Sequence, residues 1–453
     1  MTERLEPEEL LDSFDAEQRR AALSGLAASH EGRLPPAGAN LNMHFHSFFS
    51  YNAEGWSPSH IAWRSRVEGL YAAGLCDFDV LDGLEEFLAA GRTLALRATV
   101  NLETRAYFKE FAEADISSPG EPGVTYIMGA GFARAPRPGS EQERELDRYR
   151  IRARERNEAL LARINSHLPD IALDYERDVI PLTPSGNATE RHIVSAYVRR
   201  AISQLRHPDA VCRFWSGVLG TGADETLELM ADRPRLEEAV RARLVKRGGP
   251  GYEQPSAETF PTVDAFIEWV LACEAVPMIT WLDGTSGGER DARAMVSCLM
   301  SKGASALNII PERNWNLSDS AERALKVAKL NEIVAIAEDE GLPINVGTEM
   351  NKLGLPFADD FGVDALSPHR EAFVRGACIM TGHTLLARYA GFSYVSAAAA
   401  AEFPGRKARN AFFEKVGGLP PIGVKQAHML EDMGEEKALR WFREKVSRPC
   451  PLP

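Results

Sequence analysis

The chain has 453 residues and a formal net charge of −13, from 52 Lys or Arg and 65 Asp or Glu. At ~150 residues per domain this length predicts about three domains and a large hydrophobic core. The acidic balance opposes general binding of nucleic acid or of an anionic membrane surface, so we expect neither partner. A hydrophobic content of 44% with 26% charged residues is typical of a globular protein and excludes a fibrous or disordered chain. No oligomeric state is predicted.

The first 23 residues are acidic and lack the basic and apolar regions of a targeting signal, which predicts a cytoplasmic protein. No window of ~18 apolar residues occurs, so we expect no membrane span. The six cysteines are scattered without a C-x-x-C pair, which indicates reduced thiols rather than disulfides or a thiolate zinc site. The final segment, SRPCPLP (447–453), predicts a disordered tail.

Residues 1–40 predict an N-terminal helical appendage, because charged and apolar positions alternate at helical spacing before a Pro/Gly segment. From residue 41 onward, short apolar runs recur, and each ends in a polar cluster. They predict seven strands, at 42–47, 75–83, 94–106, 124–132, 276–284, 306–314 and 342–351. Segments of helical periodicity separate most of them, at 59–73, 289–302 and 318–340 among others, and this indicates β/α units and a parallel sheet.

The interval between the fourth and fifth strands is too long for one crossover helix. It contains three helical stretches, at 139–166, 193–205 and 225–245, and the first of these is highly charged. We interpret residues 137–275 as an inserted helical subdomain; a free-standing domain is the alternative. The predicted organisation is therefore one barrel (41–136 and 276–400) with one insertion, the appendage in front and a C-terminal helical tail (401–453).

Polar residues end several of the predicted strands in pairs at i and i+2, a spacing that directs both side chains to the same side of a strand. In β/α barrels the carboxyl ends of the strands form the active-site rim. Each pair alone has an ordinary explanation, such as two unrelated histidines, a turn or a structural ion pair. Together they favour a shared site of imidazole and carboxylate ligands, which suits Zn, Mn or Fe. The pairs are His44 and His46, Asp77 and Asp79, Glu103 and Arg105, Trp281 and Asp283, and Glu349 and Asn351.

Four motifs occur in the order seen in a known family: N-x-H-x-H-S (42–47), G-L-x-D (74–77), a strand containing Glu103, and G-T-E (347–349). Over roughly residues 41–360 the chain resembles the PHP (polymerase and histidinol phosphatase) domain family of metal-dependent phosphoesterases. TERHI (189–193) and GYEQP (251–255) are similar to motifs of the family's helical insert. The resemblance implies an α/β fold, a distorted seven-stranded β/α (TIM-like) barrel with a helical insertion between strands four and five.

The resemblance also implies ligands for one divalent metal ion. These are His44, His46, Glu103 and Glu349, the last a Glu where the family has Asp. Other family ligand positions hold different residues, namely Phe78, Asn52, Asn351, a residue near Tyr126, and Leu282 or Asp283. We therefore expect no third metal and leave a weaker second one open, with Asp77 and Asp283 as its candidate ligands.

Further residues are candidates for binding the substrate or moving a proton. Arg105 shares the strand face of Glu103, and Arg191 lies in the insert motif, from which it would reach over the barrel mouth. Surface or structural charge is the alternative for the candidates His192, Arg313 and Lys352, and Asn351 is a further substrate-binding candidate. Asp79 or Asp283 would act as general base if it is not a ligand.

The first functional hypothesis is a cytoplasmic metal-dependent hydrolase, a phosphoesterase that acts on a small phosphorylated metabolite, an anionic substrate, with metal-activated water. A second hypothesis is a degenerate member of the fold that binds metal or ligand without phosphatase turnover, since so many family histidines are absent. A barrel hydrolase of non-phosphate chemistry, such as amide hydrolysis, is a third, because one fold supports many reactions.

Overall fold

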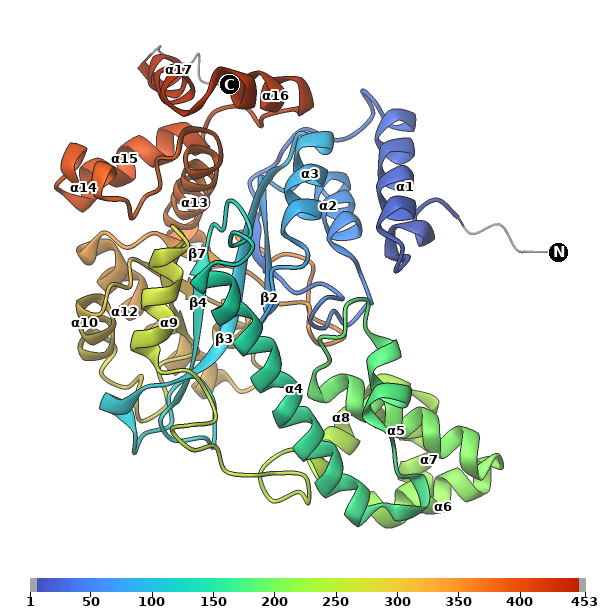
Figure 1. The fold of residues 1–453 in the computed structure, drawn as a ribbon. Coiled ribbons are helices and arrows are strands. Elements are labelled where there is room, and N and C mark those ends of the chain that lie inside the picture. The colour runs from blue at the N-terminus through green and yellow to red at the C-terminus, as the bar shows by residue number, and fades with distance from the viewer. Residues whose placement is uncertain (1–5, 448–453) are drawn as a thin grey trace.

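Seven strands form one sheet in the order of the chain, each next to its sequence neighbour. Figure 1 shows this sheet with helices around it. The computed structural model describes residues 6–447. All seven predicted strands are confirmed, because each apolar run is a strand buried between the barrel interior and the surrounding helices. They are β1 (Asn42–Phe45), β2 (Ala72–Phe78), β3 (Arg97–Tyr107), β4 (Val124–Ala130), β5 (Val276–Trp281), β6 (Ala306–Ile309) and β7 (Ile344–Val346).

The first and last strands meet and nearly close the sheet into a barrel. Just beyond β7, the Glu349 N–H donates to the His44 carbonyl at 2.8 Å, and the His46 N–H donates to the Glu349 carbonyl at 2.9 Å. These bonds form a parallel bridge between Phe45 and Glu349. The fold is therefore the seven-stranded α/β barrel that the sequence predicts, and its closure brings the ends of β1 and β7 together.

The prediction of a wholly parallel sheet is wrong for one strand. β4 pairs antiparallel with both β3 and β5, whereas the other neighbours pair in parallel. A parallel connection needs a crossover, usually a helix, but only the short turn η2 (Lys109–Phe111) lies between β3 and β4. The carboxyl end of β4 therefore lies at the opposite rim from those of the other six strands.

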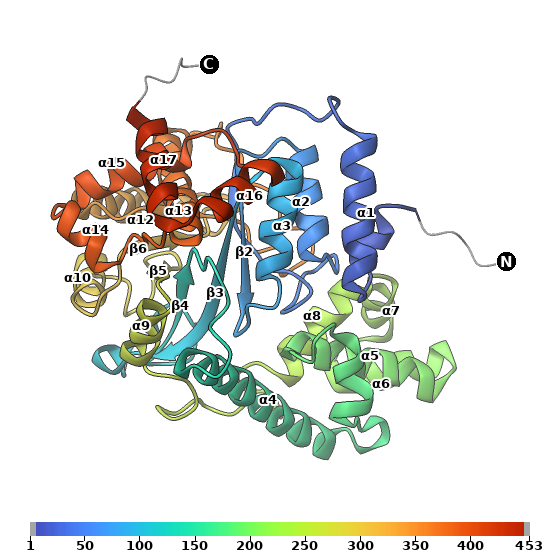
Figure 2. The same ribbon diagram turned by 45° about the horizontal axis from the view of Figure 1, so that its top comes forward.

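Helices surround the barrel in the expected intervals (Figure 2). The helix predicted at 59–73 is shorter than expected, because Gly69 turns the chain with a φ of +67° and β2 begins at Ala72. The barrel helices are α2 (Pro58–Val67), α3 (Leu84–Leu94), α9 (Val263–Ala272), α10 (Ala292–Ser301), α11 (Glu312–Trp315), α12 (Ser320–Glu340), the turn η6 (Ser367–His369) and α13 (Arg370–Ala390).

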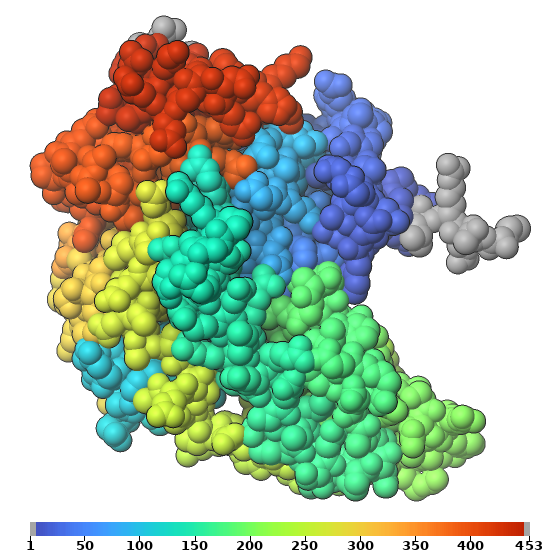
Figure 3. All heavy atoms as spheres, viewed as in Figure 1, coloured from blue at the N-terminus to red at the C-terminus, as the bar shows by residue number. Residues whose placement is uncertain are grey.

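The stretch between β4 and β5 is helical and forms a lobe beside the barrel, drawn in green in Figure 3. It has an apolar core of its own, and its long first helix also supplies Leu146 and Tyr149 to the barrel core. The helix predicted at 225–245 is two helices, because Asp232 caps a new one with Pro234 in its first turn. The elements are α4 (Glu141–His167), η3 (Pro169–Ile171), η4 (Tyr175–Val179), η5 (Ile180–Leu182), α5 (Glu190–Leu205), α6 (Pro208–Leu219), α7 (Ala223–Ala231) and α8 (Arg233–Leu244).

The terminal segments pack into the barrel core as well. Leu11 and Leu23 from the N-terminal helices, and Phe413 and Phe442 from the C-terminal ones, all belong to the main apolar cluster. The N-terminal elements are η1 (Glu9–Asp12) and α1 (Ala16–Ser29); the C-terminal ones are α14 (Ala397–Glu402), α15 (Arg406–Gly417), α16 (Val424–Met433) and α17 (Glu435–Ser447). The tail predicted to be disordered lies outside the described residues, except for Ser447.

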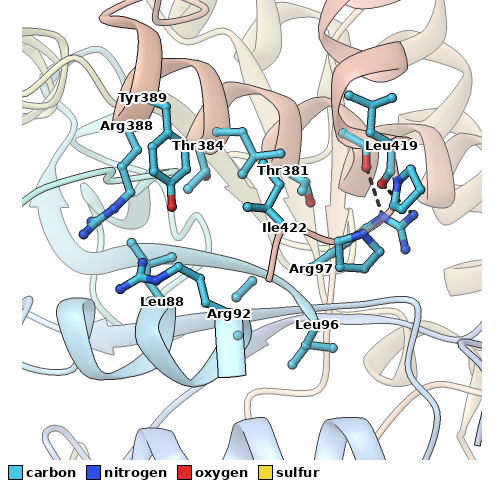
Figure 4. A pocket seen from close by; sticks show the side chains of 16 residues that line it. Leu88, Arg92, Leu96, Arg97, Thr381, Thr384, Arg388, Tyr389, Leu419 and Ile422 are labelled. Atoms are coloured by element: carbon cyan, nitrogen blue, oxygen red, sulfur yellow. Dashed lines mark hydrogen bonds between the residues drawn. The ribbon is translucent and has the colours of Figure 1, made fainter. Parts of the chain in front are cut away.

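A small cavity lies where the C-terminal segment meets α3, the start of β3 and α13 (Figure 4). Arg97 spans it by donating to the carbonyls of Gly417 at 3.0 Å, Gly418 at 3.3 Å and Leu419 at 3.0 Å. Its volume of about 40 Å³ holds only a few water molecules. Because Arg97 begins β3, the cavity lies at the amino-terminal end of that strand, where barrel residues serve stability rather than catalysis.

Among the described residues no helix is long and apolar enough to span a membrane. The five cysteines of this part of the chain are all free thiols, as predicted, and Cys450 lies outside it.

Candidate metal centre

Three predicted ligands meet at the carboxyl end of the parallel strands. His44 lies in β1, His46 follows that strand directly, and Glu103 lies in β3. All three side chains are buried, and one ligand atom from each lies within 4.8 Å of the others. The Glu103 Oε2 atom is 3.6 Å from His44 Nε2 and 3.7 Å from His46 Nε2. Strand geometry thus brings together residues almost 60 positions apart.

Hydrogen bonds orient both imidazole rings. The His44 Nδ1–H donates to Asn308 Oδ1 at 3.3 Å, because an amide oxygen can only accept. The His46 Nδ1 atom lies 3.4 Å from Ser50 Oγ, whose own proton is donated to Asp77, so His46 is again the donor. In the neutral form of each ring, Nε2 therefore carries the free lone pair. Although burial opposes it, Cys76 and Glu103 raise the pKa of His44 well above its ordinary value, so a metal ion at this Nε2 would replace a proton.

These Nε2 atoms are buried and have no hydrogen-bond partner among the described residues. A buried lone pair without a partner is costly unless something occupies it. Burial and the neighbouring His44 lower the pKa of His46 to about 3, which keeps its imidazole neutral and able to coordinate. Two oriented imidazoles and a carboxylate form a donor set that suits Zn or Fe, and a divalent ion would satisfy both orphaned nitrogens. The residues fit one metal ion.

The fourth predicted ligand, Glu349, lies beside this cluster but outside the group of mutually close ligand atoms. Its carboxylate accepts hydrogen bonds from Arg313 at 2.8 Å and from Asn351 at 3.2 Å. Burial alone would raise the pKa of Glu349, but Arg313 holds it at about 2. Ligation by Glu349 stays a prediction, and it would require the carboxylate to share or leave Arg313.

The candidate ligand Asp77 is fully engaged by the loop after β1. Its carboxylate accepts from the Ser47 N–H, from Ser47 Oγ and from Ser50 Oγ, each at 2.7 Å. Burial raises the pKa of Asp77 to about 6. Because Ser50 also accepts a hydrogen bond from His46, we assign Asp77 a positioning role: it orients Ser50, which in turn orients the imidazole.

Breaking the hydrogen bonds from Asp77 through Ser50 to His46 should weaken metal binding without unfolding the protein. We expect Ser50→Ala and Asp77→Asn each to lower metal affinity about 10-fold, the size found for partners that orient ligands. A chelator competition titration measures the change. Ser65→Ala is a matched control, since the Ser65 hydroxyl is equally buried but donates only to the Ile61 carbonyl. Unchanged affinity in both variants would contradict the positioning role.

The two candidate general bases, Asp79 and Asp283, each form an ion pair with a nearby cation. Asp79 has a φ of +59°, accepts from Thr104 Oγ1 at 2.6 Å and lies 3.4 Å from a guanidinium nitrogen of Arg156. The Asp283 carboxylate accepts from Thr285, and it pairs with Lys326 at 3.0 Å. Neither is part of the close group of ligand atoms.

The predicted substrate-binding residues lie around the mouth in different settings. Arg105 pairs with Glu121 at 3.0 Å, and Arg191 of the insertion pairs with Glu238 at 3.2 Å. Arg191 and Arg313 both depress the pKa of His46 after burial and His44, which places their charges near the centre. The His192 imidazole instead accepts from the Thr189 N–H and caps α5, while Lys352 is exposed and has no ion pair within the described residues.

The insertion contacts the barrel mouth through the segment before α5. The Asn187 amide donates to the carbonyls of Phe49 and Phe78, both at 3.1 Å, and Ser185 donates to Asp82 at 2.6 Å. The Arg191 guanidinium lies 5.3 Å from the centre of the Tyr51 ring. These contacts hold Arg191 beside the loops that follow β1 and β2, and its role in binding a substrate stays a prediction.

An aromatic ring stands where the resemblance would place a histidine. Phe78 stacks on His46, with ring centres 4.4 Å apart and an angle of 20° between the planes. The Tyr126 ring lies 6.1 Å from that of Phe78. Aromatic rings, and not further metal ligands, therefore lie on this side of His46. The described residues contain only one group of close candidate ligands.

Three supporting residues did not emerge from sequence reasoning. Asn308 is a lone amide inside the apolar run ALNII, and such a buried polar residue was the available signal. Ser50 and Asn187 lie in loops, where no periodicity distinguishes them.

No family model matches the sequence, and no curated protein matches it. Two solved structures are similar to the fold. An amidohydrolase from Chromobacterium violaceum, with bound sulfate and no metal, is 15% identical with a TM-score of 0.47, covering 74% of this chain and 96% of its own. A proposed metal-dependent phosphoesterase from Bifidobacterium adolescentis is 16% identical with a TM-score of 0.45, covering 75% and 98%. These values are too low to assign a function.

Proposed function

We propose that the protein is a metal-dependent hydrolase that cleaves a phosphoester of a small anionic metabolite. The observation that carries the proposal is the convergence on Glu103 of two buried imidazole nitrogens that have no hydrogen-bond partner in residues 6–447. They lie at the carboxyl-terminal rim of the barrel, where β/α barrels carry their active sites. When bound there, a divalent metal would supply an activated water and neutralise charge on the ester oxygens.

The protein's own residues would bind the metal and orient its ligands. His44, His46 and Glu103 would hold the metal, while Asn308 and Ser50 keep both rings in the required tautomer. Fixed ligand orientation matters because an open coordination site must face the substrate.

The cations around the mouth favour a phosphoester over a neutral amide. Arg105, Arg191 and Arg313 come from three different elements, β3, α5 of the insertion and α11, and the charges of Arg191 and Arg313 lie near the centre. Guanidinium groups bind phosphate oxygens bidentately and stabilise charge that develops during transfer. Because the insertion contributes Arg191 and contacts the loops after β1 and β2, the site suits a small metabolite rather than a polymer.

A substrate panel tests the proposal. Wild-type protein loaded with Mn, Zn or Fe is assayed against phosphomonoesters and against amides, alongside Glu103→Gln. We expect turnover of a phosphomonoester that Glu103→Gln reduces at least about 100-fold, since the change removes the only carboxylate of the close ligand group. Glu332→Gln, an exposed change on α12, is the control. Turnover of amides alone would point to the non-phosphate hydrolase, and metal binding without any turnover to the degenerate member of the fold.

A further inference from the structure

The register between β3 and β4 places Tyr126 on the same side of the sheet as the metal ligand Glu103. Tyr126 is directly opposite Arg105 in this antiparallel pair, and Met128 is opposite Glu103. Residues 103 and 105 share one face of β3, and directly opposite residues share a face across strands. Tyr126 therefore faces the barrel mouth beside the candidate metal centre.

The charged groups around the Tyr126 phenol include one predicted metal ligand and one predicted substrate-binding cation. Burial raises the pKa of the phenol, Arg105 lowers it, and Glu103, Glu190 and Glu121 raise it further. Tyr126 in turn is among the groups that raise the pKa of the Arg313 guanidinium. The phenol thus lies among one metal ligand and two cations of the mouth, between β3 and α11.

The Tyr126 hydroxyl is free to donate. Tyr126 is half-buried, and its hydroxyl has no hydrogen-bond partner among the described residues, whereas its backbone N–H donates to Ser117 Oγ at 2.8 Å. A phenol is protonated at neutral pH because its ordinary pKa is near 10. A protonated phenol is a hydrogen-bond donor and a poor metal ligand.

We infer that Tyr126 binds the substrate, donating a hydrogen bond from its hydroxyl to an oxygen of the tetrahedral anion held between the metal ligands, Arg105 and Arg313. The inference rests on the proposed function, because it takes the substrate group to be a phosphate. Tyr126 would be a catalytic residue that no metal-ligand motif identifies. A donor aimed at the anion from β4 would complement the two guanidinium groups, which approach from β3 and α11.

Inorganic phosphate binding to the metal-loaded protein is the test, with no turnover required. We expect Tyr126→Phe to hold the same amount of metal as wild type, by elemental analysis, and to bind phosphate about 10-fold more weakly, by calorimetry. Tyr389→Phe is a matched control, because Tyr389 is buried among residues at the far end of the barrel. Equal melting temperatures would show that Tyr126→Phe, which keeps the ring, is folded.

Each other outcome has a distinct meaning. Phosphate binding that Tyr126→Phe leaves intact would overturn the inference but not the hydrolase. A loss of metal in Tyr126→Phe would also overturn it, since Tyr126 would then act on the metal. No phosphate binding by metal-loaded wild-type protein would count against both. Tyr126-dependent phosphate binding in a protein without phosphoester turnover would leave the inference standing and overturn the proposed function.

Discussion

The double variant His44→Ala/His46→Ala should lose at least about 100-fold in affinity for Zn²⁺ or Mn²⁺ while remaining folded. The expected size follows because changing a residue that only orients a ligand already costs 10- to 100-fold, and here two of three ligands are removed. The fold should persist because neither Nε2 atom makes a hydrogen bond within the described residues. Removing the rings takes one donor each from Asn308 and Ser50, but Asn308 Oδ1 still accepts from the Asn345 amide at 2.9 Å and Ser50 still donates to Asp77.

Elemental analysis after dialysis, followed by chelator competition, measures the loss. His207→Ala/His428→Ala is the matched control, since it also removes two imidazoles but both are exposed, on the insertion and on α16. Equal metal content in wild type and in His44→Ala/His46→Ala would eliminate this centre and, with it, the hydrolase proposal.

The strands and the convergence of His44, His46 and Glu103 were predictable from the sequence because both depend on local rules. A buried strand is an apolar run, and the i and i+2 rule directs His44 and His46 to one side of β1. Barrel topology then brings the carboxyl end of β3, with Glu103, to the same rim. None of these steps requires knowledge of the loops.

The direction of β4 and the partners of the acidic residues could not be predicted in this way. An apolar run reads the same in either direction, so only the missing helix before β4 signals its reversal. The spacing of Asp77 and Asp79 predicts where each side chain points but not which donor meets it. Ser47 and Ser50 donate hydrogen bonds to Asp77, and Arg313 of α11 donates to Glu349. These contacts depend on the conformations of the segments after the strands, which no periodic pattern encodes.

The predicted boundary at residue 400 also separates elements that the structure packs together. Helix α13 lies against both β7 and α15, and glycines allow this close approach. A Cβ on Gly382 would be 2.0 Å from the Phe413 carbonyl oxygen, and one on Gly417 would be 1.8 Å from that of Cys378. The helices of the C-terminal tail thus pack against the barrel.

The same argument predicts that Gly376→Ala will lower the free energy of unfolding by about 3 kcal/mol, although alanine favours a helix by about 1 kcal/mol. The new Cβ on α13 would lie 1.9 Å from the Ile344 carbonyl oxygen, and backbone at that distance must move. Urea unfolding followed by circular dichroism measures the change. Gly25→Ala is the matched control, because Gly25 is also inside a helix but its added Cβ would meet no described atom within 4 Å beyond its chain neighbours and the nearby backbone of its helix, so it should gain stability. Gly376→Ala with wild-type stability would mean that α13 can shift away from β7 without loss of stability.

If the loss of stability is observed, metal affinity should fall with it, because Ile344 begins the strand that leads to Glu349 and to the hydrogen bonds that close the barrel.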